Sequence, residues 1–118
     1  MSLLAAYTTV SDADTADELS RQAVELDLAA CVQVEAIRST YRWQGRVETD
    51  NEWRLQFKTT AQRYPALQRW LTEVHPYELP AIYAISVAEA SAEYAAWVDD
   101  GVRTNDHPPP TAPASGAR

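Results

Sequence analysis

The segment from His75 to Pro80 combines side chains that can bind a metal ion with backbone that two prolines hold rigid. It reads His75-Pro76-Tyr77-Glu78-Leu79-Pro80. Proline fixes its own φ and favours extended backbone in the residue before it, so His75 is expected to end a helix. Imidazole with carboxylate suits Cu(II) or Zn(II), with copper the tighter ion. A rigid exit from a helix into a strand uses the same residues, and we favour this structural interpretation for a lone histidine.

Three further sets of residues are candidates for binding or assembly. Cys31 is the single cysteine, has no partner for an internal disulfide, and is interpreted as a small buried apolar group. Lys58 is the single lysine and is expected to pair with Glu52 or another acid across a sheet. Tyr41 and Trp43 are interpreted as anchors of a subunit interface, where aromatic residues are enriched.

The sequence contains no recognisable catalytic set. His107 belongs to a proline-rich end, which leaves His75 as the single histidine in a structured region, without a serine and acid in catalytic context. Hydrolase or transferase activity would require His75 and Glu78 as acid and base. The chain has only three glycines and no Gly-rich phosphate loop. We therefore expect a protein that is not an enzyme.

Composition limits the partners and the location. Ten basic and seventeen acidic residues give a net charge of −7, which argues against nucleic acid or an anionic membrane as partner. The single cysteine and the lack of an N-terminal signal pattern predict a reducing, cytoplasmic location. Acids gather in residues 12–27 and bases in residues 38–63. These are solvated faces, complementary subunit surfaces or an anion-attracting cleft.

Periodicity predicts the elements that must position these residues. Residues 3–10 read as a strand, and apolar residues recur every three or four positions from Asp12 to Asp27, as in a helix. Two long strands are expected over residues 29–43 and 46–59, joined at Gln44-Gly45. A second helix leads to His75, residues 81–87 form a fourth strand, and Ser91 caps a last helix that ends near Gly101.

The order strand, helix, strand, strand, helix, strand predicts an α+β, ferredoxin-like βαββαβ fold with a long hairpin between the second and third strands and a short C-terminal helix. Residues 1–103 form the domain, and residues 104–118 are expected to be a disordered tail. Helices should cover only the apolar face of the sheet. The uncovered face and the projecting hairpin then predict a homo-oligomer.

Several segments together resemble the CutA family of divalent-cation tolerance proteins. They occur in the family's order over about residues 4–100, and they are Tyr7-Thr8-Thr9, Leu28-Ala29-Ala30-Cys31-Val32, Tyr41-Arg42-Trp43-Gln44-Gly45-Arg46-Val47-Glu48, Lys58-Thr59, His75-Pro76-Tyr77-Glu78-Leu79-Pro80 and Glu93-Tyr94-Ala95-Ala96-Trp97-Val98. The resemblance implies a homotrimer packed through its sheets, an association with copper tolerance, and no catalytic reaction.

The chain departs from the family pattern at the ligands that the resemblance implies. Tyr7 stands where the enterobacterial branch has a cysteine, and Val74-His75 stands where that branch has two histidines. Pro80-Ala81 replaces the family's usual Pro-Glu. A metal contact is therefore expected to be weak or indirect, with Cu(II) or another divalent ion as the candidate.

The predicted sites follow from these arguments. His75 and Glu78 are the candidate metal contacts, and the candidate residues of an inter-subunit cleft or interface are Tyr7, Cys31, Tyr41, Trp43, Lys58 and Tyr77. Cys31 is expected to lie about 15 to 20 Å from His75, too far for a shared site. The alternative function is a trimeric signalling or small-ligand-binding module like the PII regulators, an analogy of architecture alone.

Overall fold

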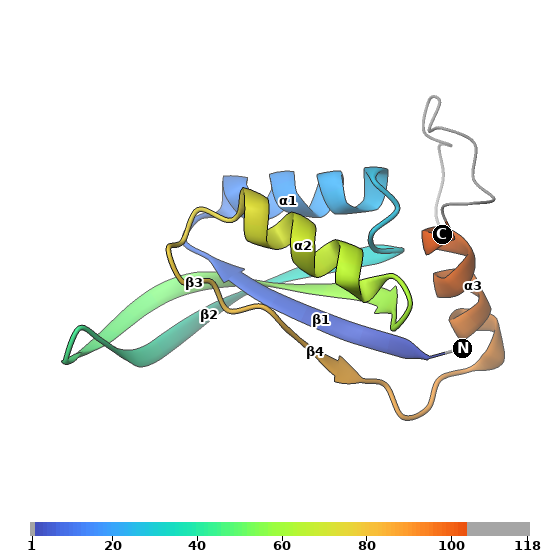
Figure 1. The fold of residues 1–118 in the computed structure, drawn as a ribbon. Helices are drawn as coiled ribbons and strands as arrows, with labels where there is room; N and C mark the ends of the chain where they lie inside the picture. The colour runs from blue at the N-terminus through green and yellow to red at the C-terminus, as the bar shows by residue number, and fades with distance from the viewer. Residues whose placement is uncertain (1, 104–118) are drawn as a thin grey trace.

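A computed structural model describes residues 2–103 of the protein. The elements follow the predicted order: β1 (Leu3–Val10), α1 (Ala13–Glu25), β2 (Cys31–Trp43), β3 (Arg46–Thr60), α2 (Tyr64–Val74), β4 (Tyr83–Ser86) and α3 (Ala92–Val102). They form one four-stranded sheet in the order β2-β3-β1-β4, in which every neighbouring pair is antiparallel. Helices α1 and α2 lie side by side on one face (Figure 1). The predicted α+β, ferredoxin-like fold is confirmed. The tail prediction falls on residues 104–118, outside the described part of the chain.

Local sequence explains where the first helix begins and ends. Asp12 is its N-cap, and the Asp12 Oδ1 carboxylate oxygen accepts a 2.7 Å hydrogen bond from the Thr15 N–H. Asp27 has a φ of +58°, a left-handed conformation that aspartate tolerates and that a continuing helix does not allow. The Arg63 Nε–H then donates to the Asp27 carbonyl at 3.0 Å. The helix is thus shorter than the Asp12–Asp27 periodicity predicted.

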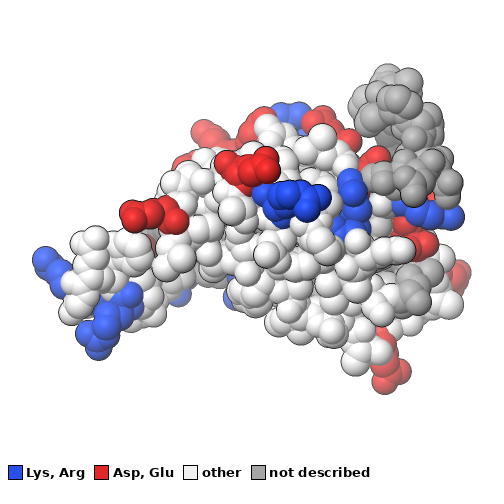
Figure 2. Space-filling view, viewed as in Figure 1, with Lys and Arg blue, Asp and Glu red and all other residues white. Residues whose placement is uncertain are grey.

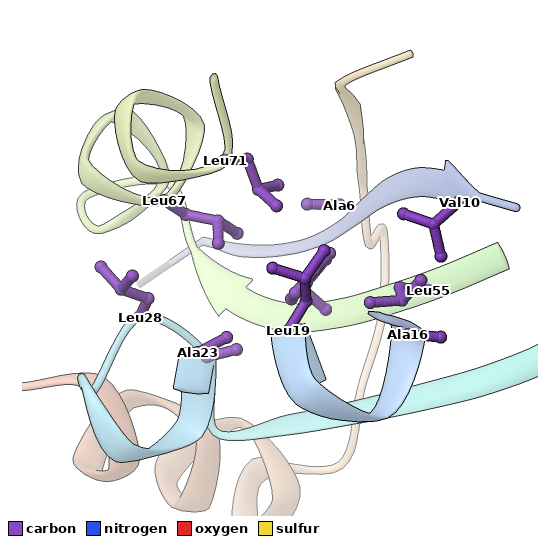
Figure 3. Close-up of a cluster of buried hydrophobic side chains, with 11 residues drawn as sticks. Ala6, Val10, Ala16, Leu19, Ala23, Leu28, Leu55, Leu67 and Leu71 are labelled. Atoms are coloured by element: carbon purple, nitrogen blue, oxygen red, sulfur yellow. The ribbon is translucent and has the colours of Figure 1, made fainter. Parts of the chain in front are cut away.

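The core lies between the sheet and the two helices α1 and α2. Leu55 and Phe57 of β3 are fully buried and alternate with residues on the opposite face, as the period of two predicted. Leu19 of α1 and Leu67 and Leu71 of α2 converge on them (Figure 3). Completely burying side chains of this size stabilises the fold by about 1.5–3 kcal/mol each.

Helix α3 covers part of the other face, contrary to the prediction that helices cover one face alone. Because Phe57 and Thr59 point into the core, Lys58 between them points away from it. The Lys58 Nζ lies 6.0 Å from the centre of the Tyr94 ring of α3. Ser91 caps α3 as predicted, because its hydroxyl accepts a hydrogen bond from the Tyr94 N–H.

Residues 2–103 leave the remaining part of that second face uncovered, and we call it the open face. It carries Tyr7 of β1, Tyr83 and Ile85 of β4, and Arg54 and Gln56 of β3. Tyr83 is 47% exposed and Ile85 is 53% exposed.

The hairpin of β2 and β3 extends well beyond β1. The last β3 residue that pairs with β1 is Trp53, whereas β2 and β3 pair as far as Trp43 and Arg46. We call residues 37–52 the arm (Figure 1). Its tip is a two-residue turn in which Gln44 and Gly45 have φ of 51° and 79°, the left-handed pair that a type I′ turn requires. The predicted turn is therefore confirmed.

Charges are distributed over distinct elements. Acidic side chains gather over the helical layer, and basic side chains lie at the end of the arm (Figure 2). On α1, Arg21 forms ion pairs with both Glu18 and Glu25, all exposed to solvent. On the open face, Arg54 pairs with Glu35 at 2.7 Å. Exposed pairs of this kind contribute little stability. No helix within residues 2–103 is long and apolar enough to cross a membrane.

Helix α3 approaches the start of β2 so closely that only glycine fits at position 101. A Cβ at Gly101 would lie 2.9 Å from the Ala30 Cβ. We expect Gly101→Ala to lower the free energy of unfolding by about 1–3 kcal/mol through overpacking, although alanine favours a helix. Urea unfolding at fixed protein concentration measures the change. The double variant Gly101→Ala with Ala30→Gly restores the space, so a double variant no more stable than Gly101→Ala would contradict the explanation.

Candidate functional site

Residues 75–82 cross the end of β1 and connect α2 to β4. His75 follows α2 directly and has extended backbone, with φ −68° and ψ 135°, so the predicted rigid exit from the helix is confirmed. β4 begins only at Tyr83 and pairs with Leu4–Tyr7, leaving the last residues of β1 without a strand partner on that side. This makes β4 shorter than the predicted residues 81–87.

His75 takes the place that a longer β4 would occupy. Its Nε2 lies 3.0 Å from the Thr9 carbonyl oxygen and 2.9 Å from the Thr8 hydroxyl oxygen. Its Nδ1 accepts a hydrogen bond of 3.1 Å from the Tyr77 N–H. An imidazole that accepts at Nδ1 carries its proton on Nε2, where it donates to the strand. The side chain is 9% exposed, so this neutral ring fastens the segment to β1.

Tyr77 extends the same attachment to β3. The Tyr77 hydroxyl donates a 2.6 Å hydrogen bond to Glu52 Oε2, and its ring lies 4.9 Å from the His75 ring, centre to centre. Burial, together with the neighbouring Glu52 carboxylate, raises the pKa of Tyr77. The phenol therefore stays protonated as a donor. Residues 75–77 thus join α2, β1 and the base of the arm.

Glu78 is exposed to solvent, whereas His75 is buried. Within residues 2–103, no three histidine, cysteine, aspartate or glutamate side chains are grouped closely enough to hold a metal ion. A metal ion at His75 Nδ1 would displace the hydrogen bond from Tyr77. The metal contact at His75 and Glu78 remains a prediction.

Tyr7 lies on the open face, whereas His75 lies on the helix-covered face. The Tyr7 ring stacks on Tyr83 at 5.3 Å, centre to centre, with 20° between the planes. The Gln56 side-chain amide donates a 2.6 Å hydrogen bond to the Tyr7 hydroxyl, and the Arg54 guanidinium lies 5.8 Å from the ring centre. Thr8, which contacts His75, points the opposite way along β1. Tyr7 and His75 therefore share one end of the sheet without sharing a site.

Cys31 and Lys58 form one cross-strand pair near α3, remote from His75. Lys58 donates a 3.0 Å hydrogen bond to Gln33 Oε1. The prediction that Lys58 pairs with Glu52 or another acid is therefore wrong, because Lys58 donates to an amide oxygen and Glu52 accepts from Tyr77. Cys31 is partly exposed, not the buried group that was predicted. Thr9, the strand partner of His75, pairs with Arg54 of β3, and Lys58 lies four residues further along that strand. Four strand residues correspond to about 13 Å, which separates Lys58 from His75.

Tyr41 and Trp43 lie on the arm, on the same side as an alternating set of acids. The Tyr41 hydroxyl donates to Asp50, and this bond is the main cause that raises the pKa of Tyr41 to about 12. Trp43 is 39% exposed and pairs with Arg46 next to the turn. The carboxylates of Glu48, Asp50 and Glu52 share this side by strand alternation.

Comparison with known proteins identifies the family of this chain. The family model for the CutA1 divalent ion tolerance protein matches residues 4–101. The chain belongs to the CutA1 family. The divalent-cation tolerance protein CutA of Thermotoga maritima is 36% identical over 100 residues, which cover 85% of this chain and 99% of that protein. Human protein CutA is 38% identical over 82% of this chain and 55% of its own length.

Solved structures of CutA proteins share the fold. CutA from Synechococcus elongatus PCC7942 superposes with a TM-score of 0.83 at 40% identity, covering 86% of this chain and 90% of that one. The periplasmic divalent cation tolerance protein CutA of Archaeoglobus fulgidus gives a TM-score of 0.83 at 27% identity, covering 87% and 100%. The names of the Thermotoga and Archaeoglobus relatives state tolerance to divalent cations, and none of the four names states a reaction.

The important partners in this CutA1 chain include residues that sequence reasoning missed. Thr8 anchors His75, Glu52 anchors Tyr77, and Tyr83 stacks on Tyr7. The sequence did indicate that Glu52 has a partner, since it is an acid within a strand next to Trp53, but the predicted partner was Lys58. Thr8 carried none, because a threonine in a strand is ordinary.

The enclosed histidine predicts a pH dependence of stability. Burial lowers the pKa of His75 from its ordinary value, more than the Thr9 hydrogen bond and the Glu52 carboxylate raise it. The unfolded chain takes up a proton at about pH 6.5, and the folded chain takes it up only at lower pH. Below about pH 6.5 the unfolded state therefore binds more protons, and the free energy of unfolding falls as the pH falls.

We expect wild type to lose more stability than His75→Gln between about pH 7.5 and about pH 5.5, because glutamine does not titrate. Urea unfolding of both proteins at each pH measures this difference, and His107, present in both, cancels. Equal losses in the two proteins would show that the histidine does not titrate as described.

Proposed function

We propose that this CutA1 protein is a non-catalytic homotrimer of divalent-cation tolerance whose contact with copper or another divalent metal ion is weak or indirect, and that it acts in the cytoplasm. The match of the family model to residues 4–101 carries the proposal. The relatives' names supply the tolerance to divalent cations. The names of the relatives do not state the assembly, the metal contact or the location, and these three properties are what we propose.

The open face and the arm support self-association. Tyr7, Tyr83 and Ile85 give this face an aromatic and apolar centre, which arginine and glutamine border. Such a composition is typical of interface cores. The arm is a two-stranded ribbon, and an isolated ribbon is marginally stable in water. A neighbouring copy that covers both features would stabilise them together.

The geometry at His75 supports weak or indirect metal binding. Both ring nitrogens already have hydrogen-bond partners inside the fold. Glu78 is exposed, and no group of three metal-ligating side chains exists within residues 2–103. A metal ion would therefore find one or two ligands per subunit, so tighter binding would require ligands pooled between copies.

Two measurements on the purified protein test the proposal. Light scattering is expected to give a mass near three times the 13.2 kDa of the chain. Calorimetric titration with Cu(II) and Zn(II) is expected to give weak heats that decrease in His75→Gln and in Glu78→Gln. A monomeric mass would contradict the assembly, and no heat with either ion would leave only the indirect role.

The cytoplasmic location needs its own test, because the Archaeoglobus relative is described as periplasmic. Cell fractionation followed by immunodetection measures it. Recovery outside the cytoplasm would contradict this part of the proposal.

A further inference from the structure

The two sides of the arm differ in charge. Residues that face each other in an antiparallel pair share a side, and successive residues along a strand alternate between the sides. All three acids of residues 37–52, which are Glu48, Asp50 and Glu52, therefore lie on one side. The opposite side has no acid, and its polar residues are all exposed to solvent. We call this set the arginine side of the arm, and it consists of Arg38, Thr40, Arg42, Thr49 and Asn51.

No acid neutralises the two arginines of this side. Within residues 2–103, neither Arg38 nor Arg42 forms an ion pair. Arg42 donates one long hydrogen bond, of 3.5 Å, to the Gly45 carbonyl. Arg21 and Arg54, by contrast, both pair with glutamates of their own helix or sheet. The positive charge at the end of the arm (Figure 2) is therefore available to an anion.

The groups between and beside the arginines are also hydrogen-bond donors. The Thr40 and Thr49 hydroxyl oxygens face each other across the two strands at 3.1 Å. In such a pair one hydroxyl donates to the other, and the second keeps its proton for an outside acceptor. Asn51 stands opposite Arg38, and its side-chain amide can donate as well. A ligand of this surface must therefore be rich in acceptors and carry negative charge.

The spacing lets both arginines reach one anion. Arg38 and Arg42 each stand two residues from Thr40, which corresponds to about 6.6 Å along a strand. Both side chains leave the ribbon on the same side and are long enough to bring their guanidinium groups over the threonine pair. A guanidinium binds a phosphate through two parallel N–H donors. A phosphate ester has three strong acceptor oxygens, enough for two guanidiniums and a hydroxyl, whereas a carboxylate has two oxygens.

We propose that the arginine side of the arm binds a phosphate group, either as the free ion or as the ester of a small molecule. Arg38 and Arg42 hold its oxygens, and the Thr40–Thr49 pair lies beneath it. The net charge of −7 acts weakly here, because charges more than about 8 Å apart are largely screened at physiological salt. The site belongs to one chain and does not rest on the proposed metal contact or on the trimer.

Arginine side-chain NMR of the full-length protein tests the proposal. The Nε–H signals of Arg38 and Arg42 are assigned by their loss in Arg38→Gln and in Arg42→Gln. The protein is titrated at about pH 7.5, where a phosphate group carries close to two negative charges. Inorganic phosphate and glycerol phosphate are used in separate titrations, and at least one is expected to shift both signals along a single saturating curve. The probe with the lower Kd identifies the form that the site prefers.

Matched variants separate a site from general attraction to positive charge. R38Q/R42Q is expected to weaken phosphate binding about tenfold or more, followed at the Thr40 and Thr49 amides. R46Q/R69Q removes the same charge from exposed positions outside the arginine side and is expected to change the Kd by less than about twofold. T40V/T49V keeps both arginines and the β-branched shape, and is expected to weaken binding through loss of the hydroxyls.

Several results would overturn the proposal. One is that neither phosphate probe shifts the two arginine signals more than sodium chloride does at the same ionic strength. Another is that R46Q/R69Q weakens binding as much as R38Q/R42Q, or that T40V/T49V leaves it unchanged. Light scattering adds a further check, because R38Q/R42Q is expected to keep the mass of the wild type. A lower mass would mean that carboxylates of a second copy occupy the arginine side in place of a phosphate.

Discussion

Replacing Tyr83 and Ile85 together by aspartate is expected to reduce the mass of the protein in solution threefold, to the 13.2 kDa of one chain. Both side chains lie on the open face and are about half exposed in the single chain. An assembled interface would bury two unpaired carboxylates per subunit, which costs several kcal/mol each. Light scattering with far-UV circular dichroism measures mass and folding together.

The control for this prediction places the same change elsewhere. Val24 and Leu26 at the end of α1 are 41% and 50% exposed, so the double aspartate variant there makes the same change of charge at apolar positions of similar exposure. It is expected to stay assembled, with at most about 1 kcal/mol lost from acids near a helix C-terminus. A folded Tyr83→Asp/Ile85→Asp protein that keeps the mass of the wild type would show that the open face is not the interface.

The fold was predictable because its strongest signals are local. Leu55 and Phe57 alternate with polar residues along β3, and Gln44-Gly45 can form a left-handed turn, so hairpin and core face follow from the sequence. The length of β4 was not predictable. It depends on the His75 imidazole bonding to the Thr9 carbonyl, a contact between residues 66 positions apart.

The candidate site was only partly predictable for a related reason. The strand order alone predicts that Tyr7 and His75 lie at one end of the sheet. To predict whether they lie on the same face, one must also know to which face each side chain of β1 points. Tyr7 and Thr8 give opposite indications, because the larger aromatic side chain faces out and the polar threonine is fully buried. The buried threonine is explained by its histidine partner, which no local pattern indicates.

Removing the His75 imidazole is expected to lower the free energy of unfolding by about 2–5 kcal/mol. His75→Ala leaves the Thr8 hydroxyl, the Thr9 carbonyl and the Tyr77 N–H without their present partner at a nearly closed position. Urea unfolding at neutral pH and fixed protein concentration measures the loss. Val74→Ala, at the exposed neighbouring position, is the control and is expected to change stability by less than about 1 kcal/mol.

A double-mutant cycle with Thr8→Val determines whether the histidine acts through the strand. Valine keeps the shape of threonine and removes the hydroxyl that lies 2.9 Å from His75 Nε2. If that contact contributes, Thr8→Val costs more in wild type than in His75→Ala, with a coupling free energy of about 0.5–3 kcal/mol. Strictly additive losses would mean that the Thr8 contact does not account for the effect of His75→Ala, which would then come from the cavity and from the bonds to the Thr9 carbonyl and the Tyr77 N–H. A coupled result would establish His75 as the residue that fastens the 75–82 segment to β1. A metal ion could bind the imidazole only if it displaced these structural hydrogen bonds.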